Sequence, residues 1–265
     1  TSFSGMKGAS AVGRVVCIGI YVLLICFVFT TLPKFGGFSG LLGELPEKYD
    51  SMGNMPTQRI VAWIVGGCIS TAVMQAVLQP LLSAKSPEAA RVGSILGYVI
   101  AAPICFFTAI CGMLSKASGA DLGDGSTAFA YAIKTFSSPV FAGIIFAFAT
   151  MIIAATMATM MLATGTIITN VYKTEINPDV DDAKVLKLSK TITFVFAYLT
   201  LIPAFLIPSK SLTNLFLTLQ HVAAAPVSFS ILAGLLWKKT TKQGAFWSML
   251  TGMITGVAWM LLGLT

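Results

Sequence analysis

The segment Ile152 to Met161, IIAATMATMM, places two threonine hydroxyls inside a long apolar run. On a helix, Thr156 and Thr159 lie about one turn apart, among alanines and methionines. Small apolar residues alone would suffice for crossing lipid, so the two hydroxyls call for an explanation. That explanation depends on the solvent around the helix, which the composition of the whole chain indicates.

The composition is that of an integral membrane protein. The chain has 265 residues, of which 56% are hydrophobic and only 10% are charged, whereas a soluble domain is about a quarter charged. Crossing the roughly 30 Å hydrocarbon core takes about 20 helical residues. Seven apolar runs meet this length, at about 11–32, 60–82, 92–115, 138–168, 187–208, 211–237 and 243–264. We therefore predict an all-α, multi-span transmembrane bundle that forms a single domain over residues 1–265.

The basic residues predict the orientation of these spans. Of the seventeen Lys and Arg residues, eleven fall on the side of the N-terminal stub and six on the other side. The positive-inside rule then places the larger group in the cytoplasm and the C-terminus outside the cell membrane. The basic residues form no dense patch with interleaved aromatics, so nucleic acid is not expected as a partner.

Motifs for enzymatic chemistry are missing from the sequence. It contains no phosphate-binding loop, nucleophile triad or cluster of metal ligands, which argues against an enzyme and against a cofactor other than a possible sodium ion. The acidic stretch GADLGDGS, residues 119–126, has two acids at a calcium-like spacing but lacks the longer pattern of a calcium loop. We interpret it as a solvated outer loop.

Several spans carry residues that favour interruption of a helix. Gly66-Gly67 falls in the second span, Pro203 and Pro208 in the fifth, and Pro226 in the sixth. A broken helix frees backbone groups that lipid cannot satisfy, so it persists only where neighbouring helices or a water-lined cavity provide partners. The positions mark either a binding cavity of the kind found in transporters or simple packing kinks.

Three interpretations compete for Thr156 and Thr159. Each hydroxyl can bond to the carbonyl one turn earlier, which satisfies it locally. Alternatively, the small residues let another helix approach closely. In the third interpretation the two hydroxyls, with carbonyls near Ile152 and from a broken helix, form a site for a hard cation such as sodium.

Three segments resemble the C-terminal part of the sodium/solute symporter family, in the family's order. QPLLSAKSPEAARVG (79–93) resembles its QR-x-x-AAKS-x-x-AR-x-G loop, with Pro80 in place of Arg. SPVFAGIIFAFATMIIAATMA followed by TIITNVYK resembles its P-x-x-x-G…AAxxST…TxDIYK helix. LQHVAAAPVSFSILAGLLWKKTTKQGAFWSMLTG resembles its IQ…P…GLFWKRxTxxGA segment.

The resemblance implies the five-plus-five inverted-repeat fold of the leucine transporter. The first span would be the last helix of repeat one, and the second to sixth spans would form repeat two. Helices N-terminal to this sequence, in the same polypeptide, would supply the other half of the ion and solute sites. Counted from Gly143, the family's sodium-binding Ser-Thr pair corresponds to Ala155 and Thr156; counted back from NVYK, it shifts by one residue. With Ala155 the serine hydroxyl is lost.

Two further positions depart from the family pattern. Gly13 or Arg14 stands where the first span of the family carries an acid, and Asn170 replaces the aspartate of DIYK. A cation held by fewer oxygens and near an arginine is bound more weakly. These departures put ordinary sodium coupling in question.

The resemblance also indicates where solute would bind. Gln220 matches a glutamine that contacts substrate in the family's sugar transporters, while GGCISTAVMQ in the second span lacks the aromatics that cover the sugar. We expect a small polar pocket, near the midplane, whose lining residues are Gly67, Ser70, Gln75, Gln220 and His221. Gln75 and His221 have an alternative role in packing between helices.

We therefore predict a secondary transporter that moves a small polar or organic-anion solute with a cation, by alternating access. A homologue that has lost sodium dependence is one alternative. A sensory or structural membrane domain with the same bundle is another. The GxxxG at Gly252 to Gly256 additionally predicts a contact face for a partner helix.

Overall fold

The structure, a computed structural model, describes residues 5–46, 56–123, 125–206 and 224–262. Over these residues it is helical and contains no strand, which confirms the all-α class. The chain divides into two compact units, one of Thr1–Met52 with Ala84–Leu206 and one of Gly53–Ser83 with Ile207–Thr265. We call them unit 1 and unit 2 and describe each by itself. The single-domain organisation stays a prediction.

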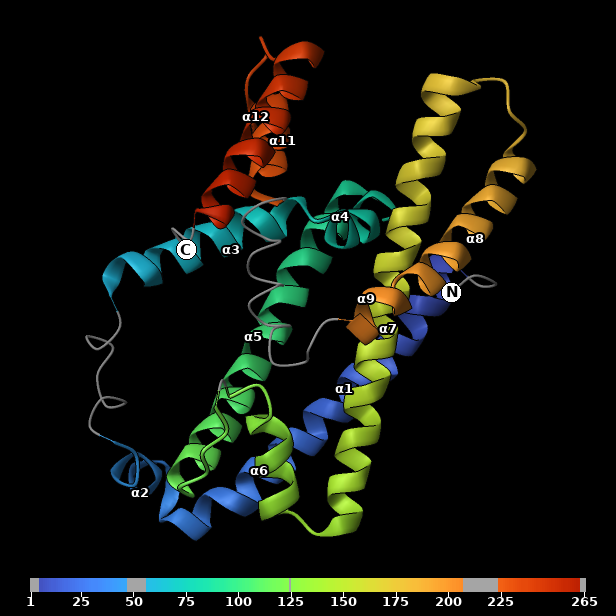
Figure 1. The fold of residues 1–265 in the computed structure, drawn as a ribbon. Helices are drawn as coiled ribbons and strands as arrows, with labels where there is room; N and C mark the ends of the chain where they lie inside the picture. Colours follow the sequence, from blue (N-terminus) through green and yellow to red (C-terminus); the bar gives the residue numbers. More distant parts are fainter. Residues whose placement is uncertain (1–4, 47–55, 124, 207–223, 263–265) are drawn as a thin grey trace. The chain divides into compact units, whose positions relative to one another are not determined.

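Unit 1 is built around three long helices. Its elements are α1 (Gly5–Thr31), η1 (Leu32–Phe35), α2 (Gly37–Gly43), α5 (Pro87–Ala117), α6 (Ala128–Phe136), α7 (Pro139–Val171), the π-helical η4 (Tyr172–Ile176), α8 (Asp182–Leu199) and α9 (Leu201–Leu206). Helix α7 packs against both α1 and α8, and α5 contacts α1 and α6 (Figure 1). The helix that carries the opening segment is thus central to this unit.

The core of unit 1 lies where α1, α5, α6 and α7 meet. Leu24 and Phe27 of α1, Leu114 of α5, Ile133 of α6 and Ile145 of α7 are each at most 2% exposed. In water, burying an aliphatic or aromatic side chain contributes about 1.5–3 kcal/mol. Between helices in lipid, close packing and hydrogen bonds take over this role.

The two longest helices begin in the same way. The Ser86 hydroxyl accepts the backbone N–H of Ala89 at 3.1 Å at the start of α5, and Ser138 accepts that of Phe141 at 3.4 Å at the start of α7. In both cases a proline follows the serine. The serine satisfies one of the four free N–H groups at the helix start, and proline has no N–H to leave unsatisfied there.

A glycine permits the close approach of α7 and α8. A Cβ atom added to Gly165 would lie 2.4 Å from the Thr193 hydroxyl oxygen and 3.0 Å from the Ser189 carbonyl oxygen. Thr193 is only 4% exposed, and its hydroxyl donates to the Ser189 carbonyl at 2.8 Å. Small residues at such contacts let helix backbones pack closely in membranes.

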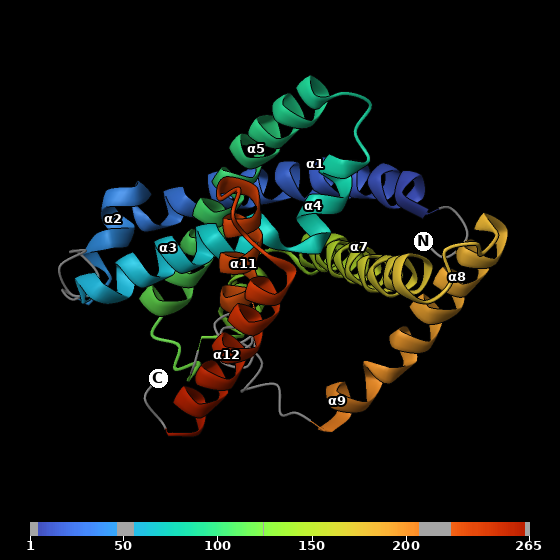
Figure 2. The same ribbon diagram turned by 90° about the horizontal axis from the view of Figure 1, so that it is seen from above.

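Unit 2 contains α3 (Thr57–Val73), α4 (Gln75–Leu82), α11 (Ala225–Leu236) and α12 (Lys242–Leu261). Helix α11 contacts both α3 and α12, and α11 and α12 run side by side in Figure 2. A Cβ atom on Gly252 would lie 2.6 Å from the Cβ of Pro226, so the predicted glycine contact face of α12 packs on α11 within the chain. Gly252, the first glycine of the GxxxG, therefore faces α11.

Among the described residues, three helical segments are long and apolar enough to cross a membrane: Ala11–Phe35, Pro87–Ala117 and Pro139–Ile176. They coincide with the first, third and fourth predicted spans. The second predicted span is divided between α3 and α4, and the fifth between α8 and α9. In the described residues of the sixth and seventh, α11 and α12 are single helices.

The prediction of a break at Gly66-Gly67 is wrong. Helix α3 runs through both glycines and ends at Val73, and the interruption falls at Met74, whose backbone is extended (φ −61°, ψ 126°). A glycine in a helix costs about 1 kcal/mol but keeps its N–H donor, so the pair weakens α3 without forcing a break.

The sequence also predicts helix interruptions at prolines of the fifth and sixth spans. Proline removes a backbone donor and clashes with the carbonyl four residues earlier. Accordingly α8 ends at Leu199, four residues before Pro203, which lies within α9. Pro226 is the second residue of α11, but the residues before Ala224 lie outside the described part, so a break at Pro226 stays a prediction. Pro208 lies outside the described residues.

Candidate ion and solute site

The predicted ion ligands lie on one unbroken stretch of α7. The Thr156 hydroxyl donates to the Ile152 carbonyl at 3.0 Å, and the Thr159 hydroxyl donates to the Ala155 carbonyl at 3.0 Å. Each hydroxyl therefore makes the hydrogen bond to the carbonyl one turn earlier that the first interpretation describes. A hydroxyl that donates its proton still has oxygen lone pairs, so both oxygens remain available to a cation.

These positions differ in exposure. Thr156 is exposed in unit 1, whereas Thr159 and Ala155 are half-buried, and Ile152 packs partly against the core. Ala155 contributes only a methyl group, so α7 offers two hydroxyl oxygens in this region. A hard cation requires several oxygen ligands. Any ion bound here needs further oxygens from another element.

The break between α3 and α4 makes backbone groups available close to residues that are predicted to bind solute. The Met74 carbonyl accepts the N–H groups of Val77 and Leu78, both at 2.9 Å, and so starts α4. At each helix end the last carbonyls or first N–H groups lack a partner within the helix. A carbonyl end and an N–H end therefore meet around Met74.

Two predicted solute residues lie on α3 just before this break. The Ser70 side chain is 3% exposed, and its hydroxyl donates to the Gly67 carbonyl at 3.3 Å. A Cβ atom on Gly67 would meet no other atom within 4 Å, so there is open space beside that residue. Thus, one to two turns before Met74, the Ser70 hydroxyl is already hydrogen-bonded, and Gly67 has empty space where a side chain would begin.

The other predicted solute residues are only partly described. Gln75 is the first residue of α4, but the position of its side chain lies outside the described part of the structure. Gln220 and His221 also lie outside it. The ion ligands belong to unit 1 and Gly67, Ser70 and Gln75 to unit 2, and their union in one site stays a prediction.

Two buried serines on α11 were not predicted as site residues. Ser228 is fully buried, and its hydroxyl donates to the Ala224 carbonyl at 2.5 Å. Ser230, 7% exposed, reaches the Ala245 carbonyl of α12 at 3.4 Å. Their spacing after Pro226, in PVSFSIL, is the sequence signal that could have found them. Both place polar oxygens on the helix that contacts α3.

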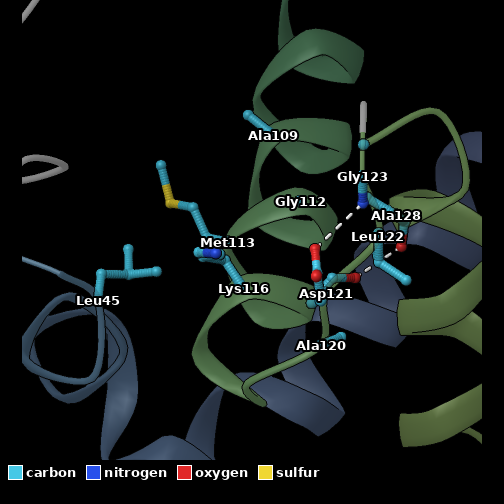
Figure 3. Close-up of a pocket in the computed structure, with 12 residues that line it drawn as sticks. Leu45, Ala109, Gly112, Met113, Lys116, Ala120, Asp121, Leu122, Gly123 and Ala128 are labelled. Carbon is cyan, nitrogen blue, oxygen red and sulfur yellow. Dashed lines mark hydrogen bonds between the residues drawn. The ribbon is translucent and has the colours of Figure 1, made fainter.

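Unit 1 also contains a cavity of about 460 Å³ at the C-terminal end of α5 (Figure 3). The last turns of α5, the following loop and the start of α6 line it, with Lys116 and Asp121 among its side chains. The Ser115 hydroxyl beside it is committed to the Ala128 carbonyl at 2.7 Å. None of the predicted ion or solute residues lines this cavity.

An ion pair links the segment after the C-terminal end of α7 to the start of α8. Lys173 Nζ donates to Asp182 Oδ1 at 2.5 Å. The hydrogen bond and the positive charge of Lys173 lower the pKa of the Asp182 carboxyl below its ordinary value of 3.8. Asp182 is highly exposed, so water and salt weaken this pair and it contributes little to stability.

No group of His, Cys, Asp and Glu side chains that could hold a metal is found among the described residues.

The sequence model of the sodium:solute symporter family matches residues 12–252, which include the helix α7, the interruption at Met74 and helix α11. The chain belongs to the sodium:solute symporter family. It is therefore a membrane protein from a family of transporters, as the resemblance of its motifs predicts.

Curated relatives that are named as symporters or cotransporters match the chain at low sequence identity. The chain is 25% identical to an uncharacterized symporter, YodF, of Bacillus subtilis (strain 168) over 96% of its own length and 52% of that protein's. It is 27% identical to a sodium/glucose cotransporter of Vibrio parahaemolyticus over 84% of this chain and 46% of that one. For sodium/glucose cotransporter 4 of Danio rerio the identity is 20%, over 71% of this chain and 32% of that protein.

The chain thus spans about half the length, or less, of the curated relatives that it matches. No solved structure matches it closely enough for comparison.

Proposed function

We propose that the full-length protein is a secondary transporter that moves a small polar or organic-anion solute together with a cation, by alternating access. The observation that carries this proposal is the interruption at Met74, within a chain of the symporter family. In lipid, broken helices are maintained where backbone groups bind cargo or line a cavity. The protein would act in the cell membrane, with its C-terminus outside.

The ion would bind on α7. Thr156 and Thr159 offer hydroxyl oxygens whose lone pairs are free after each proton is donated to the backbone. Thr156 is the exposed one and is the better placed to meet ligands from another helix. Carbonyl oxygens from a broken helix would complete the shell of a sodium ion.

The solute would bind near the α3–α4 break. The N-terminus of α4 carries a partial positive charge that favours an anionic group of the solute. Gly67 leaves space beside α3, and Ser70, Gln75, Gln220 and His221 would add polar groups. Two relatives are named sodium/glucose cotransporters, but the second span of this chain has no aromatic residue in GGCISTAVMQ on which a sugar ring could stack. This difference favours a small solute over a sugar.

A second candidate is transport that does not depend on sodium. Ala155 favours it, because the position that matches the family's serine has no side-chain oxygen. The two candidates differ in one measurable property, the response of uptake to a sodium gradient.

The test is uptake by the full-length protein in proteoliposomes, with and without a sodium gradient, across a panel of small anions, amino acids and sugars. We expect Thr156→Ala to lower the apparent sodium affinity about tenfold, since a hydrogen-bonding or ligating group facing a charge contributes roughly 1.5–3 kcal/mol. Thr150→Ala is the matched control. Thr150 is also exposed on α7 and donates to the Phe146 carbonyl at 2.8 Å, but it lies outside the predicted site.

Each outcome of the uptake experiment distinguishes between the candidate functions. Uptake that requires sodium and weakens only in Thr156→Ala supports the first proposal. Uptake that is insensitive to sodium supports the second. A full-length protein that transports none of the panel but still binds a solute contradicts both, and would favour a sensory domain.

A further inference from the structure

The charge of the chain is concentrated in its last third. Seven of the seventeen basic residues and none of the ten acidic residues follow Asp182. The part of the chain up to Asp182 therefore carries as many acids as bases, and the whole formal charge of +7 resides after it. The seven are Lys184, Lys187, Lys190, Lys210, Lys238, Lys239 and Lys242.

Two of these lysines lie in the short connection between α11 and α12, and a third, Lys242, is the first residue of α12. We call residues 237–242, WKKTTK, the basic turn; Lys238, Lys239 and Lys242 are all exposed in it. Hydrogen bonds fix its shape. The Thr240 hydroxyl donates to the carbonyls of Ala233 and Trp237, both at 2.9 Å, so the turn is tied to the end of α11. The three ammonium groups are thus attached to one ordered segment of backbone.

Large aromatic side chains flank the basic turn. Trp237 is 63% exposed, and Phe246 and Trp247 in the second turn of α12 are 57% and 60% exposed. The rings of Phe246 and Trp247 lie 5.6 Å apart in an edge-to-face arrangement. Tryptophan prefers the level of the lipid headgroups, where its ring contacts lipid and its N–H contacts water. The aromatic residues place the lysines at the membrane surface.

Within the described residues, no acidic side chain pairs with any of the three lysines. Other cations of the chain do have partners: Lys173 pairs with Asp182, and the Arg59 guanidinium lies 5.2 Å from the centre of the Trp63 ring. The basic turn therefore presents a positive charge that the described part of the protein does not neutralise.

We propose that the basic turn binds the phosphate headgroup of an anionic phospholipid in the cytoplasmic leaflet. The charge complementarity and the flanking aromatics fit a lipid, whose phosphate lies at the same depth as the tryptophans. The positive-inside orientation places this turn on the cytoplasmic side, where anionic lipids are enriched. A lysine near such a surface contributes about a fivefold preference for anionic lipid. This binding is independent of the transported solute.

The test uses the full-length protein in phosphatidylcholine vesicles, with Trp237 and Trp247 as the only tryptophans. Brominated phosphatidylglycerol or brominated phosphatidylcholine is added at equal mole fraction, and quenching of tryptophan fluorescence reports which lipid lies beside the turn. We expect stronger quenching by the anionic lipid. The variant with Lys238→Gln, Lys239→Gln and Lys242→Gln should lose this preference, at about fivefold per lysine.

The matched control has Lys184→Gln, Lys187→Gln and Lys190→Gln, the same charge change on α8. It should keep the preference, as should replacement of the three turn lysines by arginine. Equal quenching by both lipids in the parent protein would overturn the proposal, and so would loss of the preference in the α8 control. Displacement of the lipid by millimolar inorganic phosphate would also overturn it, because the turn would then be a site for free phosphate.

Discussion

Helix α7 and the α3–α4 pair both carry polar groups within predicted membrane spans, but they do so in different ways. Helix α7 continues without a break over 33 residues, and its polar groups are threonine hydroxyls that bond to its own carbonyls. Helices α3 and α4 are separated at Met74, where backbone groups themselves become available. An unbroken helix offers side-chain oxygens and carbonyls that already accept a hydrogen bond within the helix, whereas a broken one also offers carbonyls and N–H groups that have no partner within a helix. The two regions thus differ in the kind of polar group that each makes available.

Helix α7 packs closely against α8 at Gly165, and the largest effect is expected there. Gly165→Ala would place a methyl group 2.4 Å from the Thr193 oxygen and 3.0 Å from the Ser189 carbonyl. Such overpacking should destabilise the protein by about 3 kcal/mol, more than a hundredfold in the folding equilibrium. Thermal unfolding of the purified protein in detergent measures it.

Gly143→Ala is the control on the same helix, since no atom lies within 4 Å of the added methyl group. It should leave stability unchanged or raise it slightly, because alanine is the better helix former. Equal destabilisation by the two variants would show that α7 does not depend on the contact at Gly165.

The break at Met74 can be tested by its access to water. In the full-length protein with its native cysteines replaced, Met74→Cys should react with a charged thiol reagent at least about twentyfold faster than Ile69→Cys, because we expect the broken backbone at Met74 to line an aqueous cavity. Labelling rates in intact vesicles provide the measurement. Similar rates at the two positions would mean that the interruption is a packing kink.

The oxygen missing from α7 can be restored. Ala155→Ser adds the hydroxyl that the family places at this position, and we expect the apparent sodium affinity of uptake to rise up to about tenfold. Sodium titration of uptake measures this change. Met151→Ser, on an exposed position one turn earlier, adds a hydroxyl outside the predicted pair and should have no effect. A gain in both variants would argue against a defined ion site at residue 155.

The smallest effect is expected at the C-terminal end of α7. The Lys173 ion pair lowers the pKa of Asp182, so the folded state is favoured above pH 3.8 and loses this contribution as the pH falls through the depressed pKa. Because the carboxylate is exposed, Asp182→Asn should lower the melting temperature at pH 7 by no more than about one degree. Differential scanning at pH 7 and pH 3 checks it; the difference between parent and variant should shrink at the lower pH. A larger effect of the variant at pH 3 would exclude the ion pair as its cause.

Much of the fold could be predicted from residue types. The apolar runs predicted helices at all seven spans, and the family motifs predicted membership that the family match confirms. Proline at residue 203 correctly predicted an interrupted helix, because a missing N–H acts through the local chain alone. Gly66-Gly67 misled the prediction, because glycine only lowers the stability of a helix and neighbouring contacts decide the outcome.

For the candidate site, the sequence supplied the oxygens but not their partners. It predicted Thr156 and Thr159 as ligands, yet left open three uses for their hydroxyls, and it missed Ser228, whose burial arises from the packing of α11. The structure shows that both threonine protons are donated to α7 itself.

By itself, the sequence determined the solvent, the helical class and the family of this protein, because lipid imposes its demand on every residue of a span and so leaves a pattern that the linear chain records. Only the tertiary structure decided where the second span breaks, that Gly165 is the contact between α7 and α8, and that α11 receives the glycine face of α12. Those features depend on which helices meet, and a contact between residues far apart in the chain leaves no local signal of its own.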